Sequence, residues 1–183
     1  RFVSFVPQGV IPAVLLPFKE DLSIDADAFR GHVLDVGMVE GVTALTLNAH
    51  STEVSSCTFD EQRHVLDLAL DAVGTRLPIV NGVYADGSLE AQRIARMAAD
   101  AGASGLLVFP PNVFRYGHRP EMAIEHFRRI AEASDLPLVL FQYPVASGQG
   151  YSLSTLLKIV EAVPTVRAIK DGCASPELHE QHI

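Results

Sequence analysis

The stretch "LPLVLF" at residues 136–141 is a short apolar run, and "VRAIK" at residues 166–170 is the next such run along the chain. Nearly continuous apolar runs of this length are typical of strands that are buried on both faces of a parallel sheet. Four similar runs precede them: "VIPAVLL" (10–16), "VTALTL" (42–47), "LPIVNGV" (77–83) and "GLLVF" (105–109). We therefore predict six buried strands.

Amphipathic helical patterns separate these runs. Thr58 and Glu61 have the spacing of a capping box, in which each side chain accepts a hydrogen bond from the other residue's backbone N–H, so a helix is predicted to begin near residue 58. Further helices are predicted in "SLEAQRIARMAADAGA" (88–103), in "PEMAIEHFRRIAEASD" (120–135) and in "SLSTLLKIVEAV" (152–163). The predicted strands begin roughly 30 residues apart, which is the length of one βα unit.

Two architectures contain alternating βα units, the open doubly wound sheet and the (β/α)₈ or TIM barrel. No G-x-G-x-x-G follows the first predicted strand, and the chain has no P-loop pattern, so the nucleotide-binding crevice of a doubly wound sheet is not indicated. We predict a single α/β domain over residues 1–183, a (β/α)₈ barrel with about six of its eight units present. Such barrels take about 250 residues, so we expect the C-terminal part of the barrel to be missing from this sequence.

Composition excludes several classes of partner. The net charge is −8 and the 14 basic residues are spread along the chain, which argues against nucleic-acid binding. No apolar window approaches the roughly 18 residues that span a bilayer, so no membrane partner is expected. Two cysteines are too few for a disulfide framework and indicate a reducing, cytoplasmic setting. A small-molecule partner fits these properties best.

Lys170 ends the sixth predicted strand. In a barrel, side chains at the carboxyl ends of the strands lie at the mouth, where the chemistry takes place. A lysine in this position is often no more than a solvated charge. Partial burial would lower the pKa of its amine, and the neutral amine could then attack a ketone and form an iminium. The sequence therefore offers a candidate for covalent carbonyl chemistry that requires neither a metal nor a cofactor.

Further segments occur in order along nearly the whole chain: "GVIPAVLLPFKEDLSIDADAFRGHV", "STEVSSCTFDEQRHVL", "DAGASGLLVFPP", "HFRRIAEASDLPLVLFQYP" and "AIKD". Together they resemble the dihydrodipicolinate synthase and N-acetylneuraminate lyase family of class I aldolases. The resemblance implies a (β/α)₈ barrel, commonly a homo-oligomer such as a dimer or tetramer. It also implies that the lysine on the sixth strand, here Lys170, condenses with pyruvate or another 2-oxo acid, and no cofactor is expected.

The family's G-[TS]-T-G-E motif, which holds the carboxylate of the 2-oxo acid, corresponds to residues 49–53, "AHSTE". The resemblance implies that Ser51 and Thr52 bind this carboxylate through their hydroxyls. His50 replaces a hydroxyl residue, and both glycines of the motif are absent. We expect His50 either to contribute to substrate binding at the mouth or to be an ordinary polar loop residue.

The family's Y-N-x-P motif, whose tyrosine relays protons, reads "FQYP" here (141–144). Phe141 lacks the hydroxyl and is expected to form a wall of the substrate pocket. Tyr143 follows two residues later, and residues i and i+2 of a strand share a face, so its phenol is a candidate for the catalytic relay. The alternative is that Tyr143 packs beneath the mouth and that His50, Ser51 or water relays the proton.

The segment "PVASG" (144–148) replaces the P-S-R-T-G of dihydrodipicolinate synthases, whose arginine binds the carboxylate of the second substrate. Ala146 cannot do so, which favours a lyase or hydro-lyase over a dihydrodipicolinate synthase proper. A catalytically impaired relative that only binds 2-oxo acids is the alternative that Phe141 favours. Leu16, Phe109 and Phe114, together with Phe141, indicate either an apolar substrate tail or simple packing.

Four residues near the end of the sequence, and one earlier cysteine, have metal-binding or nucleophilic side chains. His179 and His182 do not match H-E-x-x-H, and no third ligand is apparent nearby, so surface histidines and no metal site are predicted. Asp171 either supports Lys170 or is an ordinary turn residue. Cys57 and Cys173 are expected to be small apolar fillers.

Overall fold

The computed structural model describes residues 5–183. Its sheet has five strands that pair in chain order, and every pairing is parallel. The strands are β1 (Leu45–Leu47), β2 (Ile79–Val83), β3 (Gly105–Val108), β4 (Leu138–Gln142) and β5 (Val166–Asp171). In a doubly wound sheet the strand order reverses at a switch point, whereas the wall of a barrel is sequential. The sequential order agrees with the predicted barrel.

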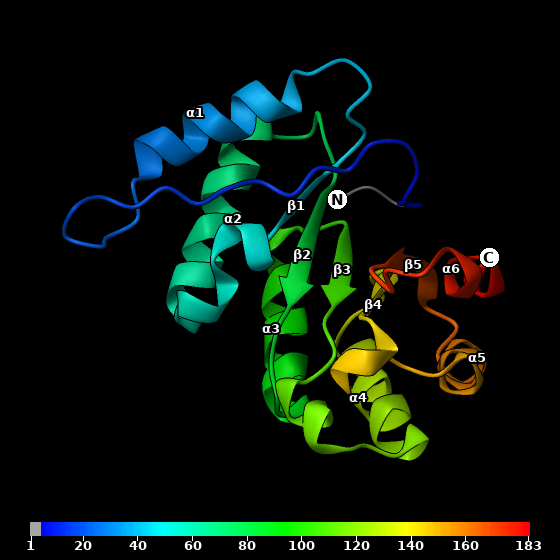
Figure 1. The fold of residues 1–183 in the computed structure, drawn as a ribbon. Helices are drawn as coiled ribbons and strands as arrows, with labels where there is room; N and C mark the ends of the chain where they lie inside the picture. The colour runs from blue at the N-terminus through cyan, green and yellow to red at the C-terminus, as the bar shows by residue number, and fades with distance from the viewer. Residues whose placement is uncertain (1–4) are drawn as a thin grey trace.

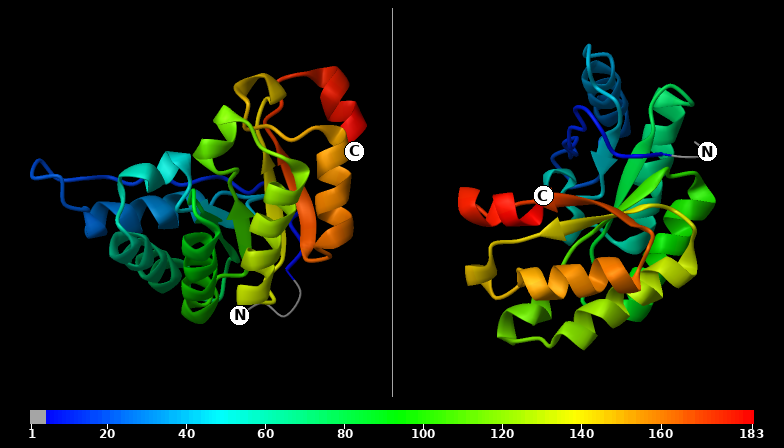
Figure 2. Two further views of the ribbon diagram at one scale, coloured as in Figure 1. Left: turned by 90° about the horizontal axis from the view of Figure 1, so that it is seen from below. Right: turned by 90° about the vertical axis from the view of Figure 1, so that its right-hand side faces the viewer.

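Five helices form an arc around the outside of this curved sheet, and a short sixth helix follows β5 (Figure 1). The helices are α1 (Ala26–Gly37), α2 (Phe59–Val73), α3 (Ser88–Ala101), α4 (Pro120–Ala133), α5 (Leu153–Ala162) and α6 (Pro176–His182). Short 3₁₀ turns follow the strands: η1 (His50–Thr52), η2 (Val54–Ser56), η3 (Asn112–Tyr116) and η4 (Val145–Ser147). Figure 2 shows η3, η4 and α6 at the same end of the sheet, where the strands terminate.

Two of the predicted helix starts, those of α2 and α5, are confirmed by capping bonds. The Thr58 backbone N–H donates to the Glu61 carboxylate at 2.7 Å, and the Glu61 N–H donates to the Thr58 hydroxyl at 3.2 Å. This capping box begins α2, while the Ser152 hydroxyl accepts the N–H of Thr155 at the start of α5. Each cap satisfies a backbone donor that has no partner inside its helix.

The prediction of a regular strand over residues 10–16 is wrong. The segment runs parallel to β1, but it forms only isolated bridges, Val10 with Val42 and Ala13 with Thr46. Pro12 has no N–H to donate, so the ladder cannot run continuously through this segment. The Val14 N–H still donates to the Thr46 carbonyl at 3.0 Å, which keeps the segment beside β1 as the first extended segment of the wall.

Two apolar clusters lie on the two faces of the sheet. The larger one packs the sheet against the helices and includes Phe29, Leu66 and Phe127. The smaller one covers the inner face of the sheet and consists of Ala49, Val80, Leu107, Phe109 and Val139. Burial on both faces explains why the strand sequences are apolar without alternation. Among residues 5–183, no helix combines the length and the apolar character that crossing a membrane requires.

Candidate active site

Lys170 lies on the inner face of the sheet, at the carboxyl end of β5. It pairs with Phe141 of β4, and its Nζ atom lies 4.3 Å from the centroid of the Phe141 ring. A cation over an aromatic face is attracted by the ring's electron density, which holds the lysine in place. Lys170 also lines a hollow of about 380 Å³ on the inner face, together with Leu107 and Val139. Lys170 thus borders an open hollow on the inner face, whose lining does not include His50, Ser51 or Tyr143.

A β-bulge decides that Lys170 faces inward. Leu138 pairs with Val166, but the next residue, Val139, pairs with Ala168, so Arg167 is an extra residue in β5. Val166 packs in the helix-facing core, whereas Ala168 packs against the inner cluster. Strict alternation from Val166 would have turned Lys170 toward the helices, because residues an even number apart share a face.

Lys170 is an exposed residue, but partial loss of solvation by the surrounding protein still lowers the pKa of its amine below the ordinary value of 10.5. Loss of solvation penalises the ammonium form, while the neutral form suffers little. A larger fraction of the side chain is therefore uncharged at neutral pH than for a lysine in water. Only this uncharged form is a nucleophile toward a carbonyl carbon.

His50 and Tyr143 form a hydrogen-bonded pair beside Lys170. The Nε2 atom of His50 lies within hydrogen-bond reach of the Tyr143 phenol, although the two residues are 93 positions apart. Tyr143 continues the inner face of β4 from Phe141, with its ring centroid 4.8 Å from that of Phe141. The His50 ring centroid lies 4.9 Å from that of Phe109. Aromatic contacts thus connect the lysine, Phe141 and the histidine–tyrosine pair.

The pKa values of this pair favour uncharged forms at neutral pH. Burial, and then the positive charge of Lys170, lower the pKa of His50 below 6.5. Burial, followed by the nearby Tyr84 phenol, raises the pKa of Tyr143 to about 12. The phenol is then the donor and the imidazole Nε2 the acceptor. Such a pair can deliver the phenol proton to a neighbouring group, while the imidazole orients the phenol.

The loop that carries His50 is held against the sheet by hydrogen bonds of the buried Asn48 side chain. Asn48 has a left-handed backbone (φ 52°), and its buried Nδ2 donates to the Asn81 side chain at 2.8 Å and to the Gln62 carbonyl at 2.9 Å. Gly82 of β2 leaves room for this turn, because a Cβ at that position would lie 1.9 Å from the Asn48 carbonyl oxygen. The position of His50 therefore depends on the glycine of the neighbouring strand that Asn48 packs against.

We expect Gly82→Ala to lower the free energy of unfolding by roughly 1–3 kcal/mol, the usual cost of forcing extra atoms into a packed interior. The added methyl must push the Asn48 backbone away, so the His50–Tyr143 hydrogen bond should also be lost. Urea unfolding measures the first effect. Gly31→Ala in α1 is the matched control, because an added Cβ there meets no atom of residues 5–183 within 4 Å. Equal stability of G82A and G31A would contradict the prediction.

Ser51 and Thr52, whose hydroxyls were both expected to bind a carboxylate, differ in burial and in hydrogen bonding. Thr52 is fully buried, and its hydroxyl donates to the Val14 carbonyl at 2.9 Å. That proton therefore ties η1 to the N-terminal segment. Ser51 is only partly buried and precedes it in the same turn. Of the four apolar residues considered for a substrate tail, Phe109 and Phe141 face inward, but Leu16 and Phe114 pack in the helix-facing core.

Two residues that support the site were not singled out from the sequence. Gln142 is fully buried, and its side chain donates to the Tyr151 carbonyl at 2.7 Å and accepts the Tyr151 N–H at 2.9 Å, which closes the loop after β4. The Tyr84 hydroxyl accepts a hydrogen bond from Asn112 at 2.8 Å. Both residues lie at the carboxyl ends of strands. This position could have marked them in the sequence as neighbours of the site.

Asp171 follows Lys170 but faces the opposite side of β5. Its Oδ2 atom accepts hydrogen bonds from Nδ1 of His179 at 2.8 Å and from Nδ1 of His182 at 2.7 Å. The His179 side chain is 55% exposed, as predicted for a surface histidine. The same prediction is wrong for His182, whose side chain is only 4% exposed because α6 folds back over β5.

Known proteins of one family are similar to this chain over nearly its whole length. The model of the dihydrodipicolinate synthetase family matches residues 6–183. A 4-hydroxy-tetrahydrodipicolinate synthase of Salinibacter ruber is 35% identical over 172 residues, which cover 93% of this chain and 55% of the relative. An uncharacterized DapA-like lyase of Halobacterium salinarum is 36% identical over 167 residues, 90% of this chain and 53% of that protein. The chain thus spans about half the length of these relatives.

Solved structures share the fold. The 4-hydroxy-tetrahydrodipicolinate synthase of Methylacidiphilum fumariolicum aligns with a TM-score of 0.87 over 96% of this chain and 57% of its own, at 23% identity. At 23% sequence identity, this structural similarity supports a shared fold and nothing further. Together with the sequential parallel sheet, it confirms the predicted (β/α)₈ barrel class.

Proposed function

Because the chain belongs to the dihydrodipicolinate synthetase family, we propose that it is a Schiff-base-forming lyase that acts on pyruvate or a related 2-oxo acid through Lys170. The observation that carries the proposal is the placement of the Lys170 amine. It lies over Phe141 on the inner face, partial desolvation lowers its pKa, and Phe141 connects it to the His50–Tyr143 pair.

In the first step, the neutral Lys170 amine attacks the keto carbon of the 2-oxo acid and forms a carbinolamine. Tyr143 donates its phenol proton to the departing hydroxyl, which leaves as water and yields the iminium. The resulting tyrosinate, held in place by its contact with His50, then takes a proton from the carbon next to the iminium, which restores the phenol and gives the enamine. Tyr143 therefore acts first as an acid and then as a base, and the positive iminium balances the charge of the tyrosinate.

The iminium then withdraws electrons from the adjacent carbon. Loss of a proton from that carbon gives an enamine, which can add to an aldehyde, and the reverse sequence breaks the same carbon–carbon bond. A hydroxyl on the next carbon can instead be expelled as water, which is the hydro-lyase variant. The electron sink is the iminium nitrogen in each case, so one lysine supports all of these reactions.

We place the carboxylate of the 2-oxo acid at Ser51, close to where η1 turns toward the mouth. Thr52 has a supporting role in this scheme, because its hydroxyl proton is donated to the Val14 carbonyl and fixes the turn. Phe141 forms the apolar wall beneath the bound acid. This division of roles refines the expectation that both hydroxyls bind the carboxylate directly.

Borohydride trapping tests the proposal directly. The chain has three lysines, Lys19, Lys158 and Lys170, so a reduced pyruvate adduct can be assigned by peptide mass spectrometry without ambiguity. We expect one adduct per chain, on Lys170, formed faster as the pH rises and the neutral amine becomes more abundant. Unmodified Lys170 at saturating pyruvate would reject imine chemistry. An adduct without any aldol turnover would instead favour the 2-oxo acid binding protein that Phe141 suggests.

A second candidate is the synthase activity named in several relatives. The observation that favours it is Arg115 of η3, whose positive charge acts on Tyr143 and whose Nη2 lies 3.4 Å from Gln149 Oε1. A guanidinium near the mouth could bind a carboxylate on the second substrate, which Ala146 cannot. Turnover of pyruvate with aldehydes that carry or lack a carboxylate separates the two candidates. At least a tenfold preference for the acidic aldehyde would favour the synthase, by roughly 1.4 kcal/mol.

A further inference from the structure

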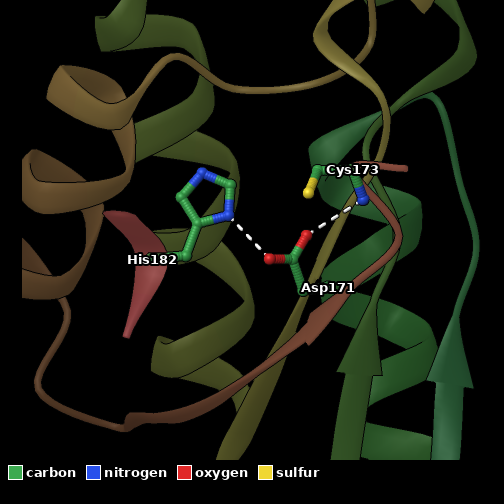
Figure 3. Close-up of side chains that lie close together, drawn as sticks. All are labelled: Asp171, Cys173 and His182. Atoms are coloured by element: carbon green, nitrogen blue, oxygen red, sulfur yellow. Dashed lines mark hydrogen bonds and ion pairs between the residues drawn. The ribbon is translucent and has the colours of Figure 1, made fainter. Parts of the chain in front are cut away.

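We infer that Asp171, Cys173 and His182 form a zinc site on the helix-facing side of β5. One ligand atom of each residue, a carboxylate oxygen, the Sγ atom and a ring nitrogen, lies within 4.8 Å of the other two (Figure 3). The three residues come from the end of β5, the segment that follows it, and α6. This site is separate from the proposed Lys170 chemistry, because Asp171 and Lys170 face opposite sides of the strand.

The donor set selects the class of metal. A thiolate, an imidazole and a carboxylate suit Zn²⁺, whereas Mg²⁺ and Ca²⁺ prefer oxygen ligands alone. Around a tetrahedral zinc ion, sulfur, nitrogen and oxygen ligands at their usual bond lengths lie roughly 3.5 Å apart. The 2.7 Å between His182 Nδ1 and Asp171 Oδ2 must therefore widen by somewhat less than about an ångström. No other separation exceeds 4.8 Å, so each needs to close by about an ångström at most, and side-chain rotations can supply both changes.

The carboxylate is already oriented for this role. Its Oδ1 atom accepts the backbone N–H of Cys173 at 2.9 Å, and its Oδ2 atom accepts Nδ1–H of His179 at 2.8 Å. Hydrogen bonds of this kind, from residues that do not themselves bind the metal, orient ligands in metal proteins. The Asp171 and His182 side chains are 7% and 4% exposed, so little water needs to be displaced.

Binding requires two proton movements. The Cys173 thiol, which donates to the Ser175 carbonyl at 3.3 Å, releases its proton to solvent and binds as the thiolate. His182 binds through Nδ1, so its ring proton moves to Nε2, and its hydrogen bond to Asp171 gives way to a shared metal ion. A water molecule fills the fourth position. His179 remains hydrogen-bonded to the carboxylate from the exposed side.

The metal would fasten α6 to the end of β5, one residue beyond Lys170. A ligand that binds only the folded state stabilises it in proportion to the logarithm of its concentration above the dissociation constant. We therefore expect zinc to raise the midpoint of thermal unfolding. The sequence pattern did not indicate this site, because Asp171 and Cys173 lie seven or more residues before His182 and match no metal-binding motif with it.

The test uses the protein at its natural length, freed of metal with a chelator and titrated with Zn²⁺ against a chromophoric competitor. We expect one zinc ion per chain and at least a tenfold loss of affinity in Cys173→Ser and in His182→Gln. His179→Gln should lose less, because His179 supports a ligand and does not bind zinc. Cys57→Ser and His64→Gln are matched controls that should bind as the unchanged protein does.

Cobalt substitution provides a readout that needs no variant. Co²⁺ in the unchanged protein should give a thiolate-to-metal charge-transfer band together with the visible spectrum of a tetrahedral ion. The inference is overturned if the Co²⁺ complex lacks the thiolate band. It is also overturned if Cys173→Ser, shown to be folded by circular dichroism, binds zinc as tightly as Cys57→Ser. The cluster would then be a hydrogen-bonded anchor for α6 and nothing more.

Discussion

Lys170→Arg is expected to abolish the borohydride-trapped pyruvate adduct and to lower turnover by roughly a thousandfold or more, as removal of a covalent nucleophile usually does. The guanidinium stays protonated at any accessible pH, so it cannot attack a carbonyl. It can still lie over the Phe141 ring, which keeps the packing of the inner face largely intact. Mass spectrometry of the trapped protein and steady-state kinetics measure the two effects.

Lys158→Arg is the matched control for this variant. Lys158 lies in α5 and is exposed, so the same substitution there should leave both the adduct and the turnover unchanged. Substantial turnover in K170R, or an adduct that moves to another lysine with turnover retained, would contradict the assignment of Lys170. Circular dichroism of K170R checks that a loss of activity does not reflect unfolding.

Tyr143→Phe should reduce turnover by roughly 10²–10⁴, the usual contribution of a positioned acid or base. The substitution keeps the ring that packs against Phe141 and removes only the phenol that His50 contacts. Because Lys170 is untouched, pyruvate should still become trapped on it after long incubation with borohydride. We therefore expect Y143F to keep the trapped pyruvate adduct on Lys170 and to lose most of its turnover.

Tyr116→Phe is the control here, since Tyr116 is 86% exposed on η3 and outside the aromatic group around His50. An unchanged turnover number in Y143F would show that the proton relay lies elsewhere. His50→Gln provides an independent check, because it removes the imidazole but not the phenol. If the pair works as proposed, H50Q and Y143F should each impair turnover, and the double variant should cost little more than either alone.

Local sequence patterns predicted most of the scaffold. The capping box at Thr58 and the proline at residue 120 marked helix starts because they satisfy or remove specific backbone donors, and such effects act within one turn. The failure at residues 10–16 has an equally local cause in Pro12. Apolar composition alone indicates a strand there, but strand regularity needs a backbone N–H at every second position.

The contact between His50 and Tyr143 could not be predicted from local sequence patterns, because the two residues are 93 positions apart. The sequence left open whether His50 lies at the mouth or on the surface, and whether Tyr143 reaches the site. Their contact joins a loop after β1 to the end of β4, and it depends on the buried Asn48–Asn81 bond and on the absence of a side chain at Gly82. No short-range pattern encodes such a contact.

The sequence by itself determined that Lys170 closes the sixth extended segment of a βα series and that a hydroxyl is missing at Phe141. The tertiary structure decided which way the lysine points. The extra residue at Arg167 shifts the register of β5 against β4 and turns Lys170 from the helix-facing core into the hollow. The physical reason is that strand side chains alternate with a period of two, so a single bulged residue exchanges the two faces for every residue that follows.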